Sequence, residues 1–438
     1  MFHLSSLGVE GGTFLLFGSM VILLIMGQPL AYLTGLVAMF FAYGWFGPKV
    51  LPLLTSRVYS FVGEYTLIAV PMFVFMASLL DRTNIAKDLY NAMQAFGGKV
   101  KGGVAVQTLI VAVFLAAMSG IIGGETVLLG MLALPQMLRL GYNKNLAIGV
   151  VCAGGSLGTM VPPSIVLIIY GLTASVSIGD LFSGAVVPAF MLASFYMAYI
   201  LIRCHLNPEL GPQGVPEGST KPKREMLFDV LAPGLIILVV LGSIYGGIAS
   251  VTEAASVGVA SVMLLAIFRR ELNLGVIQES LRQTMRTCGM IIWIGISASA
   301  LIGIYNLMGG NRFVKAAILG LDVAPVVIIL VMMMILIFLG MFMDWIGVAL
   351  LTMPIFVPII TDLGYDPVWF GVLFCMNMQV SFLSPPFGPA AFYLKSVAPP
   401  DITLIDIFKS VWPFIIMQII ALILLIAFPQ LALWLPNL

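Results

Sequence analysis

The sequence predicts an all-α polytopic membrane protein with about ten transmembrane helices and two re-entrant helical hairpins, arranged in two inverted-topology repeats. The first supporting observation is composition, because 61% of the 438 residues are hydrophobic and only 9% are charged, against roughly a quarter charged in soluble domains. The second is that apolar stretches follow one another along almost the whole chain. The third is a constant shift of 223 residues that aligns the two halves. A net charge of +1 gives no basic surface for nucleic acid. The apolar composition predicts that a lipid bilayer surrounds the protein.

A spanning helix takes about 20 apolar residues. Apolar runs bounded by Gly, Pro or charged residues predict spans at 13–27, 29–46, 64–80, 145–173, 181–203, 226–246, 252–268, 286–306, 368–396 and 411–435. Two further stretches, 103–138 and 325–360, are too long for one span, and Gly and polar residues interrupt each of them near its middle. We predict that both are re-entrant hairpins, which a membrane protein tolerates where the tips are buried in protein.

The distribution of basic residues predicts the orientation, because short cytoplasmic loops carry the excess of Lys and Arg. If the N-terminus is outside, 16 of the 20 basic residues lie on the cytoplasmic side. Both termini are therefore expected in the periplasm. The polar segment 205–225 reads as a cytoplasmic linker between a first repeat, 1–204, and a second repeat, 226–438.

The shift of 223 residues pairs positions that interrupt helices rather than apolar residues alone. It pairs the Leu-Gly-Tyr turn at 140–142 with that at 363–365, and Pro162-Pro163 with Pro385-Pro386. It also superposes the two predicted hairpins, which the charge count places on opposite sides, so the repeats are expected to be inverted. Inverted repeats with interrupted helices are typical of secondary transporters. A channel or a purely structural duplication remains the alternative at this point.

Two predicted spans contain Pro-Pro pairs in their middle, at 155–164 and 380–388. Proline inside a helix removes a donor and frees a carbonyl in the preceding turn, so both helices should unwind there. Freed carbonyls at that depth can coordinate a dehydrated cation such as Na⁺, and helix N-termini favour an anion. The alternative is a kink that serves packing only.

The two hairpin tips each carry an acidic residue, Glu125 and Asp344, with no Lys or Arg in the surrounding stretches. A carboxylate at membrane depth indicates a functional site by default, and a coupling cation is the natural partner. The alternative is a protonated or serine-bonded structural carboxyl group. Glu253, at the start of a span, is expected to be structural.

The segment Gly154 to Gly158 fits the nucleophile pattern G-x-S-x-G, but a serine nucleophile needs a base. The two histidines, His3 and His205, lie at the terminus and in the linker, where neither reaches mid-membrane. There is also no phosphate-binding loop, because Gly98-Lys99 is followed by Val100. We therefore predict that the protein is not an enzyme and does not use ATP.

With these residues in view, the chain resembles the large membrane subunit of tripartite ATP-independent periplasmic (TRAP) transporters, the DctM type, over essentially its full length. The resemblance is carried by Pro71-Met72-Phe73, Ser119-Gly120, the segment 157–164, Ile169-Tyr170-Gly171, Gly246-Gly247-Ile248, Thr252 to Ala255, Asp344 and Ser384 to Gly388. It implies a sodium-driven elevator in the bacterial inner membrane, with two or more coupling Na⁺ and no organic cofactor. It also implies two partners, a small four-helix membrane subunit and a periplasmic substrate-binding protein, and organic acids as substrates.

The resemblance also implies two sodium sites. The first would use Ser119, Gly158, Val161 and Pro163, and the second Gly340, Asp344, Ser381, Ser384 and Pro386. The predicted substrate-binding residues are Glu125, Ser156, Asn377 and Gln379. The chain departs from the family pattern in having Ile121 and Ile122 where serines are frequent, Glu125 where Thr is common and Ser381 in place of the usual glycine. Glu125 is hypothesised to mark a substrate subclass such as 2-oxo or hydroxy acids.

The function predicted from the sequence is thus import of an organic anion with Na⁺ by the large permease subunit of a TRAP transporter. The alternative is a free-standing ion-coupled anion carrier or a passive channel.

The orientation is testable at the linker. A Ser219→Cys variant should react with a membrane-impermeant thiol reagent only after the cytoplasmic side is opened, because the basic residues place 205–225 there. Labelling of intact spheroplasts at this position would contradict the predicted topology.

Overall fold

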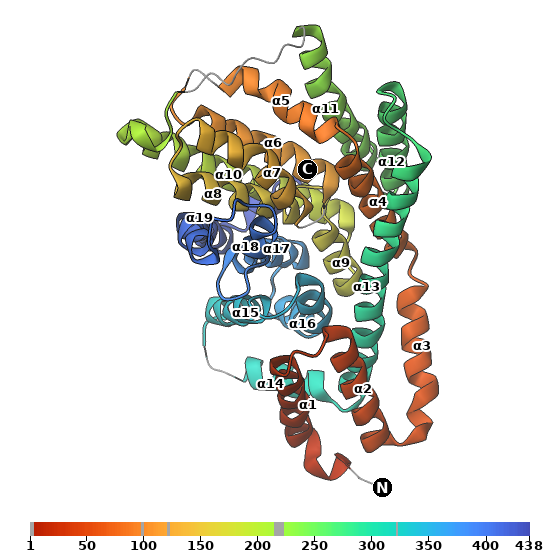
Figure 1. Ribbon diagram of the computed structural model, residues 1–438. Helices are drawn as coiled ribbons and strands as arrows, with labels where there is room; N and C mark the ends of the chain where they lie inside the picture. Colours follow the sequence, from red (N-terminus) through yellow and green to blue (C-terminus); the bar gives the residue numbers. More distant parts are fainter. Residues whose placement is uncertain (1–3, 98–99, 121–122, 214–222, 321–322) are drawn as a thin grey trace.

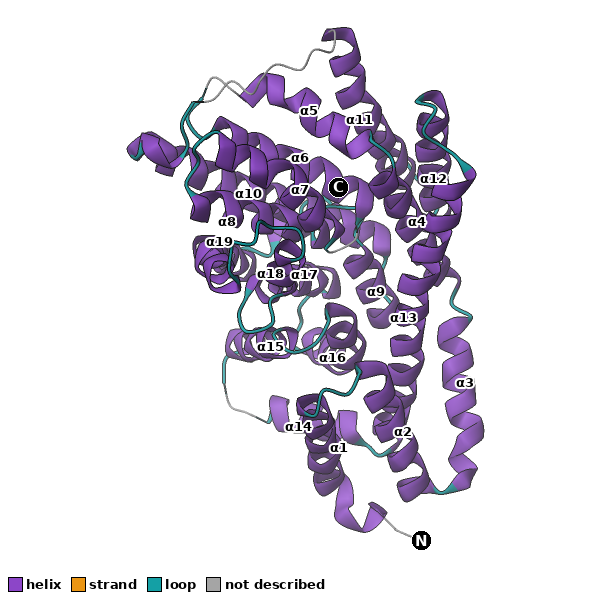
Figure 2. Cartoon of the chain, in the orientation of Figure 1, coloured by secondary structure: helices purple, strands orange, loops and turns teal. Residues whose placement is uncertain are grey.

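The computed structural model describes residues 4–97, 100–120, 123–213, 223–320 and 323–438, and within these ranges every regular element is a helix (Figures 1 and 2). A helix satisfies its backbone hydrogen bonds within its own segment, which is what an apolar solvent requires. The predicted all-helical membrane architecture is confirmed.

Within the described ranges, eight helical segments are long and apolar enough to cross a bilayer. They are α1 (Gly8–Ile25), α4 (Ala69–Arg82) with the 3-10 turn before it (Tyr65–Ile68), α10 (Ile178–Leu206), α11 (Lys223–Tyr245), α12 (Val251–Phe268), α13 (Leu274–Leu307), α16 (Trp345–Asp362) and α19 (Leu404–Ala427). The predicted span 29–46 is α2 (Leu30–Phe46), which is followed by a bend of 118°. The helix at the span predicted for 411–435 begins and ends earlier, because α19 starts at Leu404 and ends before Pro429, after which a short α20 (Gln430–Leu433) follows.

The two predicted hairpins are pairs of helices with a break where the sequence places it. The first consists of α6 (Gly103–Ser119) and α7 (Gly124–Arg139), and the second of α15 (Pro325–Gly340) and α16. The two Pro-Pro segments also interrupt their helices. One lies between α8 (Lys144–Ser156) and α9 (Ile165–Ala174), and the other between α17 (Pro367–Leu383) and α18 (Pro389–Lys395). Both Pro-Pro bonds are cis.

The longest helix is α13, which runs without interruption for 34 residues along one side of the molecule (Figure 1). It packs against α2, α4 and α3 (Leu51–Val62). The shift of 223 residues places 51–82 on 274–305, so α13 corresponds to α3 and α4 together. In the first half the helix is broken at Gly63 and Glu64, where the backbone of Glu64 turns extended.

Three helices lie outside the predicted spans, namely α3, α5 (Ile85–Gly97) and α14 (Gly310–Leu319). Each mixes apolar and polar residues at helical spacing, so none contains an apolar run of spanning length. The shift that aligns the halves also relates α5 to α14, since 85–97 maps onto 308–320. The helix predicted at 286–306 begins earlier, at Leu274. The apolar-run prediction missed its first turns because they are polar.

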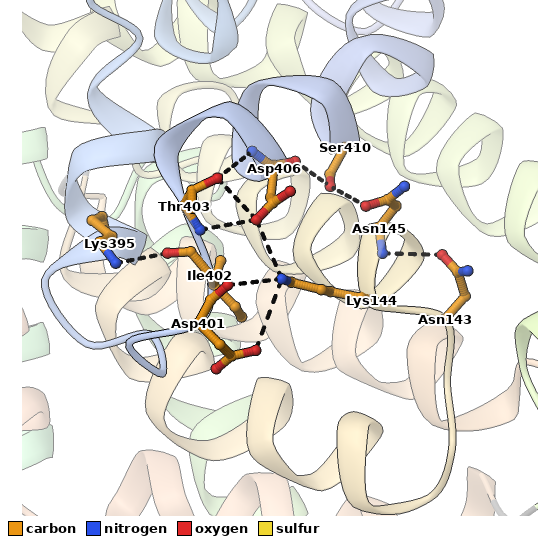
Figure 3. A network of polar contacts seen from close by, with 9 residues as sticks. All are labelled: Asn143, Lys144, Asn145, Lys395, Asp401, Ile402, Thr403, Asp406 and Ser410. Atoms are coloured by element: carbon orange, nitrogen blue, oxygen red, sulfur yellow. Dashed lines mark hydrogen bonds and ion pairs between the residues drawn. The ribbon is translucent and has the colours of Figure 1, made fainter.

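The two halves of the chain share one apolar core, in which α8 packs against α19. A polar network closes this junction (Figure 3). Lys144, at the start of α8, donates to the backbone carbonyl of Asp401 at 3.0 Å and to Asp406 Oδ2 at 3.2 Å. Thr403 and Asp406 form the capping box that begins α19. The network therefore fixes the start of a helix from one half to the start of a helix from the other.

A second charged cluster joins α5, α11 and α12. The guanidinium of Arg269 donates to Asp88 Oδ2 and to Asp229 Oδ1, each at 2.6 Å. The Arg269 side chain is only 10% exposed, and the two carboxylates are 17% and 7% exposed. The cluster holds amphipathic α5 against the spanning helices.

Replacing Arg269 should destabilise this region strongly, because removal of one partner leaves charges without compensation in a largely dry site. We expect Arg269→Met to lower the free energy of unfolding in detergent by about 3 kcal/mol. Arg282→Met is the matched control, since Arg282 is exposed on α13. Equal stability of the two variants would contradict the role given to the cluster.

Candidate functional site

A cavity of about 460 Å³ lies where the two hairpin tips face a wall formed by α4 and α13. Its hairpin side is completed by α17 and by the segment that leads into α18. The volume is in the range of small-molecule binding sites. The fold therefore brings the two hairpin tips, the start of α9 and the segment after α17, which are far apart in the sequence, to one cavity.

The second hairpin contributes Gly340, at the end of α15, and Asp344, the N-cap residue of α16. Both line the cavity together with Ser381 of α17. The close approach explains the glycine, because a Cβ on Gly340 would lie 2.5 Å from Ser381 Oγ. The structure therefore brings together three of the five residues predicted for the second sodium site.

The other two residues of that predicted set lie in the break after α17. Ser384 is buried, and its hydroxyl donates to the backbone carbonyl of Val380 at 2.6 Å. Pro386 is exposed. The residues that follow, Phe387 and Pro389, reach the cavity, so the interrupted segment borders the same hollow as Asp344.

The first hairpin packs on the break between α8 and α9. Ser119 donates to the carboxylate of Glu125 across the tip. A Cβ on Gly158 would lie 2.6 Å from Glu125 Oε1, and a Cβ on Gly120 would lie 2.4 Å from the carbonyl oxygen of Pro163. Of the residues predicted for the first sodium site, Ser119 and Gly158 thus contact the Glu125 carboxylate, and Pro163 contacts the hairpin tip at Gly120. Val161 lies in the same break and is buried.

Glu125 is only 3% exposed, and its second oxygen, Oε2, has no hydrogen-bond partner among the described residues. Burial of an ionised carboxylate is costly unless it is paired. No ion pair within the described chain involves it. The Ser119 hydroxyl and the Glu125 carboxylate are hard oxygen ligands of the kind that Na⁺ prefers. These two groups fit a cation.

The other predicted substrate-binding residues lie behind the cavity, in the core. Ser156, Asn377 and Gln379 are fully buried, and none of them lines the hollow. Ser156 Oγ lies 3.3 Å from Gln379 Oε1, and the Asn377 amide donates to the carbonyl of Met333 at 2.9 Å. Ser156 and Gln379 are 223 residues apart, so the shift that aligns the halves relates two residues that touch.

The sequence analysis missed the residues that α4 and α13 present to the cavity. Asp81 comes directly after the span predicted at 64–80, which therefore does not include it. Gln283 precedes the span predicted at 286–306, and Thr287 is the second residue of that span. A carboxylate directly after an apolar run is the signal that could have indicated Asp81.

A second cavity, of about 320 Å³, lies further along α13. Ser299, Gly303 and Asn306 of α13 line it, together with Arg57 of α3 and Glu64. The same helix therefore borders two separate hollows.

A known protein family matches almost the whole chain. A sequence model of the family described as "Tripartite ATP-independent periplasmic transporter, DctM component" matches residues 17–431. The chain belongs to this DctM family. The TRAP transporter resemblance is thus confirmed.

Among DctM-family relatives, the C4-dicarboxylate TRAP transporter large permease protein DctM of Vibrio cholerae is 28% identical over 97% of both chains. The ectoine TRAP transporter large permease protein TeaC of Halomonas elongata is 30% identical over 97% of this chain and 99% of its own. Both are transporter permeases, in agreement with the prediction that the chain is not an enzyme. The YdaH transporter of Alcanivorax borkumensis shares the fold, with a TM-score of 0.67, 14% identity and coverage of 95% and 99% of the two chains.

The contact between Gly158 and Glu125 can be tested by adding one methyl group. Gly158→Ala places a Cβ where the carboxylate lies, so we expect substrate uptake to fall at least about tenfold while the amount of protein in the membrane is unchanged. Gly242→Ala is the control, because nothing lies within 4 Å of a Cβ at that position of α11. Uptake at the wild-type rate by the Gly158 variant would mean that the carboxylate is not needed there.

Proposed function

We propose that this DctM-family permease imports a small organic acid by coupling it to Na⁺, with the substrate bound in the cavity between the hairpin tips and the wall formed by α4 and α13. One observation carries the proposal. Each hairpin places a carboxylate, Glu125 or Asp344, against an interrupted helix, and neither has a cationic partner among the described residues. Two sites of this kind call for cations.

The first proposed Na⁺ site consists of Ser119, Glu125 and the backbone carbonyls of Gly158, Val161 and Pro163. The second consists of Asp344, Ser381, Ser384 and the backbone carbonyls of Gly340 and Pro386. A site built only from neutral oxygens leaves the charge of a dehydrated cation uncompensated in a low-dielectric interior. One carboxylate in each site supplies the missing negative charge.

The proposed movement is that of an elevator, in which the hairpins and interrupted helices move together against the α4 and α13 wall. The distribution of the lining residues supports it. One side of the 460 Å³ cavity belongs to α4 and α13, which are unbroken where they line it, and the other belongs to hairpin tips and helix breaks. A substrate held mainly by the second group would travel with it.

The substrate class follows from relatives and from the cation sites. The relatives' names include C4-dicarboxylate and ectoine, and a bound Na⁺ next to the cavity would attract the acid group of such a compound. We further propose that a periplasmic binding protein delivers the substrate and that a small membrane subunit docks on the chain, as the tripartite family name indicates. The bacterial inner membrane, with both termini in the periplasm, is the proposed location.

Reconstitution tests the proposal against the alternative of a free-standing carrier or channel. We expect proteoliposomes with the permease, its small subunit and the binding protein to accumulate the organic acid only in an inward Na⁺ gradient. Proteoliposomes with the permease alone should show little uptake. Uptake by this chain alone that does not depend on Na⁺ would exclude the tripartite, sodium-driven function.

The sharpest test of the second site is Asp344→Asn, which preserves the shape of the side chain and removes its charge. The Na⁺ concentration needed for half-maximal uptake should rise at least about tenfold, equivalent to roughly 1.4 kcal/mol. Stabilisation of the purified protein by Na⁺ against thermal unfolding should shift to higher Na⁺ in the same way. Membrane insertion should not change, because it depends on the apolar spans.

Asp180→Asn is the control, because Asp180 is exposed in the first turn of α10. It should retain wild-type Na⁺ dependence. If Asp344→Asn also retains it, the Asp344 carboxylate is structural and the second site does not require a charged ligand.

A further inference from the structure

The charges that line the 460 Å³ cavity are all negative. Among the described residues on its walls, the charged side chains are Asp81 and Asp344, and no Lys, Arg or His is present. An anionic substrate alone is poorly matched to such a site, because like charges in a shared, partly dehydrated space repel.

Asp81 comes from the opposite side of the cavity to Asp344. It is the second-last residue of α4, in the wall, whereas Asp344 caps α16 in the second hairpin. Arg82, the next residue, does not line the cavity: its guanidinium pairs with Glu279 of α13 at 3.6 Å, although its charge also acts on Asp81. The side chain of Asp81 is exposed and lines the cavity, and no ion pair within 4 Å among the described residues involves it.

The two carboxylates differ in what can neutralise them. Asp344 lies beside Gly340 and Ser381, which supply oxygen ligands for a cation. Asp81 lies against Gly124 at the start of α7, where a Cβ would lie 3.3 Å from Asp81 Oδ2, and its charge acts on that of the neighbouring Glu125. A Na⁺ in each proposed site would offset Glu125 and Asp344, and the Asp81 carboxylate would still face the substrate.

We propose that Asp81 binds a cationic group of the substrate, so that the transported compound is a zwitterion, an organic acid that also carries an ammonium or amidinium group. This proposal rests on the function proposed above and adds the charge of the cargo. The acid group faces the second hairpin and its cation, and the cationic group faces the end of α4. Such a compound matches the charge at both ends of the cavity.

A different role for Asp81 would be that of a latch, in which its carboxylate holds the wall against the N-terminus of α7. A latch acts on the movement and not on the cargo, so its loss would change transport of every substrate alike. The cargo role makes a narrower claim, because only compounds with a cationic group depend on Asp81.

The test is uptake by cells that express the complete transporter with its own binding protein. The probes are three zwitterions, ectoine, 4-aminobutyrate and glycine betaine, and three anions without a cationic group, butyrate, succinate and isethionate. We expect Na⁺-dependent uptake among the zwitterions. Asp81→Asn should lower that uptake at least about tenfold, Asp81→Glu should restore most of it, and Asp180→Asn should match the wild type.

Thermal stabilisation of the purified Asp81→Asn protein by Na⁺ provides a second measurement and should be unchanged, since Asp81 belongs to neither proposed cation site. Transport restricted to the anions would overturn the zwitterion proposal and leave sodium-driven import of organic acids intact. Wild-type uptake by Asp81→Asn, or equal loss in Asp81→Asn and Asp81→Glu, would also overturn it. Absence of Na⁺-dependent uptake of any probe would count against the proposed function itself.

Discussion

Every backbone amide and carbonyl inside a bilayer needs a partner within the protein, and the architecture of this chain depends on that constraint. Each helix end lacks partners within its own helix for its terminal backbone groups, and the fold places the ends at the two hairpin tips and the two helix breaks against one another. The tip of the first hairpin lies on the break before α9, and the tip of the second lies on α17. These helix ends are thus concentrated where a cation or a substrate could bind.

The same constraint explains what could be predicted from the sequence. Long apolar runs and Pro-Pro pairs have few alternatives in a membrane, so the hairpins and the helix breaks were predictable, whereas the predicted bounds of two spans differ from α13 and α19 by seven residues or more at one or both ends. The amphipathic α5 and α14 were not predictable, because their stability comes from packing partners that no local pattern reveals. Asp81 was missed for a related reason, since only the tertiary structure turns the end of α4 toward the second hairpin.

The placement of Ser156, Asn377 and Gln379 shows the limits of motif reasoning in a different way. Their polar side chains stand next to the breaks in sequence, which suggested contact with a ligand. In the structure they connect α8, α17 and α15 within the core. Polar pairing in an apolar interior fixes how helices are aligned. Residues of this kind can position a site that they do not touch, and one residue in the sequence cannot reveal which of the two roles it has.

The uninterrupted course of α13 has a geometric consequence. At 1.5 Å per residue its 34 residues extend about 51 Å, well beyond a hydrocarbon core of about 30 Å. Thr287 and Gly303, which border the two cavities, are separated by about 24 Å along this one helix. A hairpin that moved from one hollow to the other would therefore cross most of the bilayer's thickness while it remained in contact with a single rigid surface.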